Sequence, residues 1–439
     1  MTVFFLSQWW ASKNIKLRVL LGVLFVSGTV QAQQQMSAEW VETRLGELGH
    51  LRTYVGRVAY KDSVGAIEIE ADSAVVNGSQ YVFVSNLKFQ DSIRVVRANE
   101  LHFNEKEHVA QFLGDVFFQD KKGSLAAPEV MVWPDSQKLI AKGGVVFDLL
   151  SRSQRIKANH LIYNGKSDVG IGQGAVVATV VGERGDSLHI QTDSLGFASQ
   201  EENFTFGGAS KIQQSGMYLF ATQGHYYQGV LQATGSPEMN WSRAQQADSV
   251  WANADTIEMR LEDQDLRSVS LFSRAVINLS GAQPGAVQSV RGDSASISIV
   301  NKEISTLRVL EKVQLKFEKE AQTITLGGDS VAIWFNNGHL DSLVVQGQGD
   351  GSYQGKDDGV SRVSGKKKIL WFENDDLVRM LIVGNAICRY VAAGENEGNK
   401  VDFKGDTLVL DFDQGKLSHI DVVGNVQGVY LQNKTEKVP

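Results

Sequence analysis

Two similar stretches near the end of the chain, "LVRMLIVGNAICRY" (Leu377–Tyr390) and "LSHIDVVGNVQGVY" (Leu417–Tyr430), decide the fold. In each, apolar residues occupy alternate positions and run into a Gly-Asn pair, at Gly384 and Gly424. Such alternation is typical of a β-strand with one buried face. Gly and Asn readily supply the left-handed backbone conformation that turns require. The pattern therefore predicts a repeated strand that ends in a turn at each Gly-Asn pair.

A second repeat is a six-residue phrase: a small residue, usually Asp or Asn, a polar residue, an apolar residue, any residue and an apolar residue. Its copies occupy residues 71–76, 98–103, 127–132, 158–163, 192–197, 254–259, 292–297, 328–333 and 405–410, with degenerate copies near Thr222 and Lys366. The spacing grows from about 27 residues early to about 40 late. Self-similarity at this period indicates stacked units, none of which buries its apolar face alone.

These patterns predict an all-β protein, a solenoid-like stack of repeated antiparallel strands. The composition agrees, with 43 Gly and only 5 Pro, because many strands joined by tight turns need glycine and tolerate little proline. An amphipathic helix remains an option only at 38–48. We expect a first segment at 51–235 and a second at 236–430, either separate from the first or continuous with it. A lead-in at 33–50 and a polar tail at 431–439 flank them.

The first 32 residues have the features of a secretory signal peptide. They contain no acid, three basic residues (Lys13, Lys16, Arg18), a short apolar run and a small residue, Ala32, at the expected cleavage site. The formal charge is −7, and loss of this basic leader would leave about −10, which argues against a nucleic-acid partner. The only cysteine, Cys388, allows no disulfide framework. We expect an exported, periplasmic protein.

The candidate motifs for catalysis and for cofactor or metal binding each lack a required residue or element. The eight histidines are scattered and form no ligand pair. "GIGQG" from Gly170 lacks the helix of a dinucleotide site, so we interpret it as a turn. "DFDQG" from Asp411 has Val422 where a calcium loop needs Glu. Cys388 lies in an apolar strand and is interpreted as buried filling. We therefore expect no enzyme activity, no cofactor and no metal.

A sheet with one continuous apolar face can bury that face in two ways. It can close around its own side chains, or it can curl incompletely and leave an apolar groove. An exported protein of the second kind would be a trough for apolar ligands.

The phrase, followed by alternation into Gly-Asn-Val, resembles the OstA/LptA family of periplasmic lipopolysaccharide-transport proteins. The closest stretches are 405–430 and 254–271, and the resemblance covers about 52–430. It implies an elongated, incompletely closed β-jellyroll whose interior shields lipid acyl chains. It also implies that units stack end to end, through their strand edges, into a bridge between inner-membrane and outer-membrane transport components. The family has no catalytic residues, and a typical bridge protein is less than half as long as this chain.

The expected lipid-binding positions are the paired inward residues of the repeats. They are Leu101, Phe103, Val116, Phe118, Val145, Phe147, Leu161, Tyr163, Ile257 and Met259. The alternative for each is that it simply fills the core. At the level of the protein, the alternatives are an exported β-solenoid scaffold or adhesin with a filled interior, and a polysaccharide-acting β-helix. The second would need clustered outward aromatics, which the scattered tryptophans do not provide.

Overall fold

The structure is a computed structural model that describes residues 35–46, 49–61, 68–90, 94–133, 135–149, 154–182, 185–198, 201, 203–242, 249–263, 265–280, 287–319, 322–337, 339–355, 360–391, 399–413 and 416–431. All regular structure within these ranges is β-strand, and the recorded strand pairs are antiparallel, which confirms the all-β class. The predicted signal peptide (1–32) and nearly all of the tail lie outside the described residues. The optional helix at 38–48 is wrong, because Trp40–Gly46 is a strand paired with the next one.

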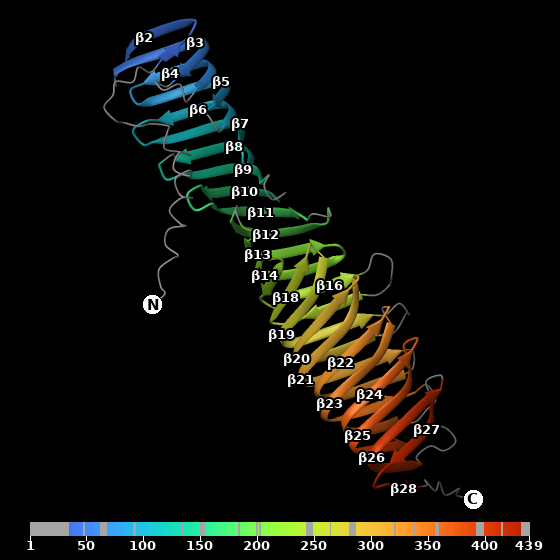
Figure 1. The fold of residues 1–439 in the computed structure, drawn as a ribbon. Coiled ribbons are helices and arrows are strands. Elements are labelled where there is room, and N and C mark those ends of the chain that lie inside the picture. The colour runs from blue at the N-terminus through green and yellow to red at the C-terminus, as the bar shows by residue number, and fades with distance from the viewer. Residues whose placement is uncertain are drawn as a thin grey trace, which may run out of the picture. The chain divides into compact units, whose positions relative to one another are not determined.

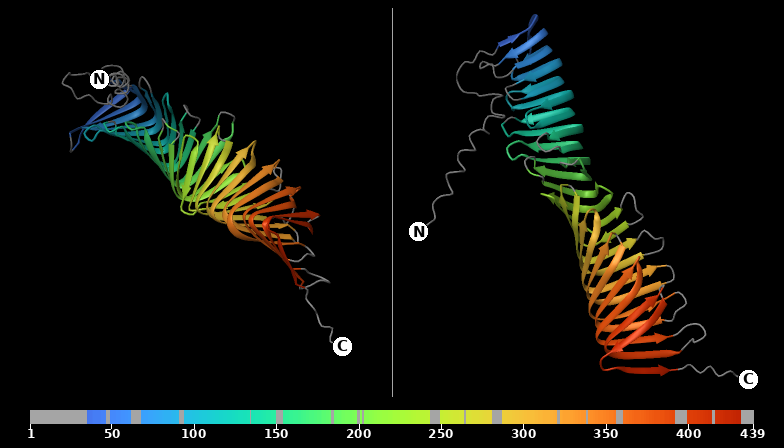
Figure 2. Two further views of the ribbon diagram at one scale, coloured as in Figure 1. Left: turned by 60° about the horizontal axis from the view of Figure 1, so that its bottom comes forward. Right: turned by 45° about the vertical axis from the view of Figure 1, so that its right-hand side comes forward.

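The chain forms two compact units. The first comprises 1–182 with 189–207, and the second comprises 183–188 with 208–439. The main boundary between the units, at 207/208, lies earlier in the sequence than the boundary expected at 235/236. In each unit, most strands that follow one another in the sequence lie side by side (Figures 1 and 2).

The first unit is a meander in which each strand from β2 onward pairs with the next. Its strands are β1 (Gln35–Ser37), β2 (Trp40–Gly46), β3 (Gly49–Lys61), β4 (Glu68–Asn77), β5 (Gln80–Gln90), β6 (Val95–Asn104), β7 (Val109–Gln119), β8 (Gly123–Trp133), β9 (Lys138–Leu149), β10 (Gln154–Asn164) and β11 (Val169–Val181). Strands β12 (Ser187–Ala198) and β13 (Asn203–Gln214) are divided between the two units.

Every strand from β3 to β11 bends near its middle. The register of each pair shifts there, for example between Arg97 and Glu100 where β6 meets β7. Alternate strands carry two successive residues with positive φ at the bend, such as Gly114 (+75°) and Asp115 (+47°) in β7. An extra residue in a left-handed conformation bends a strand and increases its twist. We call this bend the corner, and the strand halves on either side of it the arms.

The six-residue phrase forms the other half of each corner. In β6 the inward residues are Val96, Ala98, Leu101 and Phe103, so two successive residues, 99 and 100, both face outward. The small residue of the phrase thus lies on the inside of the corner. Its second residue faces the bend of the next strand, as where Asn86 Nδ2 donates to Asp72 Oδ2 at 2.7 Å.

These corners correct two expectations about turns. The Gly-Asn pair at Gly384 and Asn385 lies inside β25 (Asp376–Val391), not at a strand end. Likewise, Gly170 and Gly174 lie inside β11, where Gly174 begins a corner, so "GIGQG" is not a turn between strands. In β25 the alternation therefore continues past the pair in the same phase, from Ile382 to Ala386. At Gly424 and Asn425, by contrast, a strand (Lys416–Val423) does end, as expected.

The second unit is built in the same way, with short strands from β15 to β18 and long strands from β19 to β26. Its strands are β14 (Met217–Tyr227), β15 (Val230–Thr234), β16 (Glu238–Ser242), β17 (Ser249–Asn253), β18 (Thr256–Glu262), β19 (Asp265–Ser280), β20 (Val287–Val300), β21 (Glu303–Lys319), β22 (Gln322–Asn336), β23 (His339–Gln354), β24 (Val360–Glu373), β25, β26 (Lys400–Asp413), β27 (Lys416–Val423) and β28 (Gln427–Leu431). Strands β15 and β16 are two arms separated by a corner at Gly235 and Ser236, and β27 and β28 are separated by one at Gly424 and Asn425.

Candidate functional site

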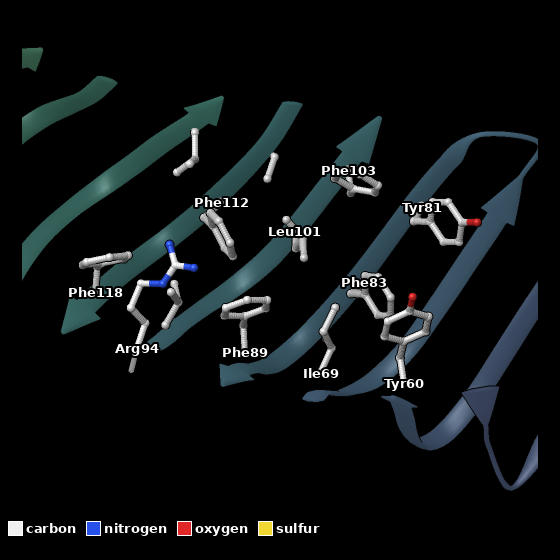
Figure 3. Close-up of a pocket in the computed structure, with 13 residues that line it drawn as sticks. Tyr60, Ile69, Tyr81, Phe83, Phe89, Arg94, Leu101, Phe103, Phe112 and Phe118 are labelled. Carbon is white, nitrogen blue, oxygen red and sulfur yellow. The ribbon is translucent and has the colours of Figure 1, made fainter. Parts of the chain in front are cut away.

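The first unit contains an apolar cavity between its two arms (Figure 3). Its empty volume is about 720 Å³, including the part open to solvent. It is lined by Tyr60, Ile69, Tyr81, Phe83, Phe89, Arg94, Val96, Leu101, Phe103, Ala110, Phe112, Phe118 and Val132. Strands β5, β6 and β7 contribute residues from both sides of their corners, as β5 does with Phe83 and Phe89, so these strands wrap around the cavity.

Aromatic rings dominate this first cavity. Phe89 and Phe112, which come from opposite arms, meet edge to face with their ring centroids 6.5 Å apart. Tyr81 packs beside Phe103 at 6.0 Å, and its hydroxyl donates to Glu105 Oε2 at 3.4 Å. Burial, and then the neighbouring Glu105 carboxylate, raise the pKa of Tyr81. The phenol is therefore a neutral polar group at the margin of an apolar space.

A second cavity in the same unit shares Arg94, Phe118 and Val132 with the first. Its empty volume is about 840 Å³, again including open solvent. Its other lining residues are Asp120, Lys122, Gly123, Ser124, Leu125, Gln137, Lys138, Leu139, Phe147, Leu149, Tyr163, Gly165 and Asp168. The shared lining makes the two cavities neighbouring parts of one apolar interior.

An aromatic cluster borders the second cavity. Phe147 lies 5.7 Å from Tyr163 and 5.8 Å from Phe197 between ring centroids. Tyr163 and Phe197 stack at 6.4 Å. A Cβ on Gly170 would collide with the Phe197 ring, so the glycine of β11 makes room for this cluster.

One edge of the second cavity is polar. Asp168 is buried and accepts a hydrogen bond from the Tyr163 hydroxyl at 2.6 Å. Lys122 Nζ lies 3.3 Å from the same carboxylate. Asp120 Oδ1 accepts from the backbone N–H groups of Lys122 and Gly123 at 2.7 and 2.9 Å, which fixes the turn before β8. The lining of the second cavity thus combines aromatic rings with charged side chains that are held in place by hydrogen bonds and an ion pair.

The ten expected lipid-binding residues fall into two groups. Five line the cavities: Leu101, Phe103, Phe118, Phe147 and Tyr163. The other five, with at most 1% of their surface exposed, are packed into the core: Val116, Val145, Leu161, Ile257 and Met259. The structure therefore shows two different environments for positions that are equivalent in the period-two pattern.

Many interior side chains of the second unit are fully buried. Ile257 and Met259 lie there among residues such as Val269, Leu271 and Ile277, none of which has measurable exposure. Aromatic pairs from opposite arms also meet directly, with Tyr353 and Phe412 at 4.8 Å and Phe317 and Phe372 at 5.6 Å.

Sequence reasoning missed most of the lining, including Phe89 and Phe112, and it missed the buried cation of the lining, Arg94. It lies in phase with the inward residues Val96 and Ala98, so the period-two pattern already indicated its direction. The arginine follows the mostly polar stretch "QDSI", so the sequence shows no clear apolar alternation on its N-terminal side.

A reactive thiol, a metal site and a membrane-spanning helix are further features that would bear on function. Cys388 is buried in β25, as expected, and burial raises the pKa of its thiol to about 11. Across the described ranges, no group of three or more His, Cys, Asp and Glu side chains is placed to hold a metal ion. No described helix is long and apolar enough to cross a membrane.

Comparisons with known proteins add little. No protein-family model matches the chain, and no curated protein matches it. Among solved structures, a crystal structure of an extracellular domain from B. thetaiotaomicron aligns over 92% of this chain and 99% of its own, at 6% identity and a TM-score of 0.09. At that TM-score the similarity supports no argument about fold or function.

Proposed function

We propose that this protein is a periplasmic lipopolysaccharide-binding bridge component that carries lipid through the apolar interior of its β-jellyroll towards the outer membrane. The single observation that supports the proposal best is the pair of cavities in the first unit, lined by aromatic rings from both arms. Each acyl methylene removed from water contributes roughly 0.8 kcal/mol, so an apolar cavity alone can hold a lipid chain. The similarity of the repeats to the OstA/LptA family points to the same ligand.

The ends of the meander suit the proposed stacking. Among the described strands, β28 pairs with β26 alone, and all five of its residues are exposed. At the other end, Trp40 and Val41 of β2 are about half exposed. An open strand edge is a template for pairing with another chain. The proposed partners are the inner-membrane and outer-membrane transport components, or a second copy of this chain.

An exported scaffold or adhesin with a filled interior is the second candidate function. The many fully buried side chains of the second unit favour it, because an interior filled by the protein's own side chains leaves no room for a ligand. In that case the first unit would be an end segment of a structural stack, and its cavities would stay empty.

Photocrosslinking separates the two functions. A benzophenone amino acid at Phe118 or Phe147 lies in the cavities, whereas one at His102 lies on the outward face of β6, and one at Leu271 lies in the packed second unit. In cells that make lipopolysaccharide, we expect lipid adducts at the two cavity positions and at neither control. A folded, abundant protein without adducts at Phe118 and Phe147 would favour the scaffold.

A further inference from the structure

An ion pair ties the two arms of the first unit together beside the second cavity. Lys122 lies in the turn between β7 and β8, at the end of one arm, and Asp168 lies in the turn between β10 and β11, at the end of the other. Lys122 Nζ lies 3.3 Å and 3.4 Å from the two carboxylate oxygens of Asp168. Both side chains line the second cavity. The pair therefore bridges the arms at the ends that lie away from the corner.

The acid of this pair is held in place. Asp168 is only 7% exposed and accepts a hydrogen bond from the Tyr163 hydroxyl at 2.6 Å. Tyr163 belongs to the same arm as Asp168, and its ring lies 5.7 Å from the ring of Phe147 on the opposite arm, between centroids. A charge pair with one buried member is screened less than a pair of exposed side chains, so it holds the arms more firmly.

The second unit contains a pair of the same kind. Lys319 ends β21, and its Nζ lies 2.7 Å from Asp376 Oδ1 at the start of β25 and donates to the Asn374 carbonyl at 3.4 Å. In both units the acid belongs to the third turn after the turn of the lysine. Successive turns of a meander alternate between the two arms, so an odd offset joins one arm to the other. The same offset in both units shows that the fold brings these two turns together.

We propose that the pair of Lys122 and Asp168 is a clasp that controls the passage of an apolar ligand between the second cavity and solvent. While the pair is formed, it holds the arm ends together. When it breaks, the arms part, and an alkyl chain passes sideways between them. The inference rests on the proposed lipid-binding function and adds a route of entry to it. Binding that requires such an opening is slower than binding to a site that is already open.

Loosening the clasp should speed exchange in both directions. The probe is N-phenyl-1-naphthylamine, which is apolar and uncharged, so the loss of a protein charge does not act on it directly. Asp168→Asn removes the charge but keeps an oxygen for the Tyr163 hydroxyl. It should raise the association and dissociation rate constants about tenfold, equivalent to about 1.4 kcal/mol. Lys122→Met should raise both about threefold, because Asp168 keeps its other interactions.

Stopped-flow fluorescence of the full chain gives both rate constants. A clasp on the path of the ligand affects entry and exit together, whereas a side chain that merely touches the bound ligand affects exit alone. A rise in the dissociation rate constant without a rise in the association rate constant would therefore overturn the proposal.

The converse experiment locks the arms. Lys121 and Lys166 are exposed in the same two turns and are not among the lining residues of the cavity. Lys121→Cys and Lys166→Cys are combined and joined by a bismaleimide whose spacer contains a disulfide. The bridge should slow probe uptake about tenfold or more, and reduction of the spacer should restore it. Cys388 is buried and its thiol pKa is raised to about 11, so it does not compete for the reagent. Uptake at the normal rate in the bridged protein would overturn the proposal.

Lys319→Met is the matched control, because it breaks the corresponding pair in the other unit. It should leave the exchange rates at their wild-type values. Rates raised as much as by Lys122→Met would show that exchange follows the general stability of the chain, which would also overturn the proposal. If wild type takes up no probe, the proposed lipid-binding function fails and the clasp fails with it. If the probe binds but neither Asp168→Asn nor the bridge changes its rates, the lipid site stands and the clasp does not.

Discussion

The strands of both units bend at the same kind of corner, but the two units differ in what fills the space between their arms. In the first unit, β4 to β10 are 10 to 12 residues long, and aromatic side chains surround cavities. In the second, β19 to β26 are 14 to 17 residues long, and the interior is packed. One backbone design therefore accommodates both an open and a filled interior.

The first residue of the phrase accounts for part of this difference. It is alanine in the first four copies, as at Ala98, but glycine in the copies from residue 292 onward, as at Gly328 and in the degenerate copy at Gly365. A Cβ on Gly328 would lie 2.5 Å from Val345 Cγ1, and one on Gly365 would lie 2.5 Å from a methyl carbon of Ile382. Glycine thus lets the next strand's side chain pack against the backbone inside the corner. Corner residues, as well as arm length, therefore control how much space remains between the arms.

The largest effect should come from truncating one interior side chain in each unit. Leu271→Ala leaves a void in a fully packed region and should reduce the free energy of unfolding by about 2–5 kcal/mol. Phe118→Ala enlarges a space that is already open and should cost less than half as much, although more atoms are removed. Hydrogen exchange measured for each unit gives the local values. Equal losses would contradict the contrast between the interiors.

Adding a methyl group inside a corner should have the next largest effect. Gly328→Ala places Cβ against Val345 and 2.7 Å from the Gln346 carbonyl oxygen, so the backbone must shift, at a cost of about 1–3 kcal/mol. Gly327→Ala is the control, because its nearest contact would be an ordinary 3.5 Å. Urea unfolding compares the two variants. A control as unstable as Gly328→Ala would show that glycine itself, not the contact, is needed.

A smaller effect is expected at Lys368, which replaces an apolar residue at the fourth position of a degenerate phrase. The side chain is buried, its Nζ donates to the Gly365 carbonyl at 3.1 Å, and burial lowers its pKa. Since the unfolded chain binds this proton more tightly, stability should rise with pH as the ordinary lysine pKa of 10.5 is approached from below. Lys368→Met should add about 1–2 kcal/mol at neutral pH. It should also flatten the pH dependence of the unfolding midpoint, and an unchanged slope would contradict this interpretation.

The smallest effect should be equal in the two units, because the corner contact is common to both. Asp72 accepts from Asn86 at 2.7 Å in the first unit, and Asp406 accepts from Asn425 at 3.0 Å in the second. Both contacts are exposed, so Asp72→Ala and Asp406→Ala should each cost about 0.5–1 kcal/mol. Thermal unfolding of the two variants tests this. Very different losses would show that the corners are not equivalent.

The sequence predicts the class and the repeat because both depend on local patterns. The phase change was visible in the phrase, where Ala98, Leu101 and Phe103 are spaced by three and then two residues. The sequence does not indicate the other half of the corner, the pair of positive-φ residues, because Glu311 and Lys312 adopt positive φ although neither is a glycine. Such residues rarely adopt that conformation, so tertiary pairing must impose it.

Which inward positions line a cavity could not be predicted. Period two places Phe118 and Leu161 on the same face, yet one lines both cavities and the other is fully buried. The difference depends on side chains from the opposite arm, such as Phe89 against Phe112, and therefore on how the arms close. Arg94 could have been assigned inward from its phase, but its place in the lining of both cavities depends on tertiary packing that no local pattern describes.

The corner also indicates how such a chain could grow over generations. Its contacts, such as Asp406 with Asn425, join two strands that are neighbours in the sequence. A duplication or deletion that removes or adds a whole hairpin therefore carries both halves of a corner and leaves every other register intact. Loss of a single strand would instead reverse the direction of all that follows. The hairpin is thus the natural unit of inheritance here, and recombination between its coding repeats would change the length of the protein in steps of one corner.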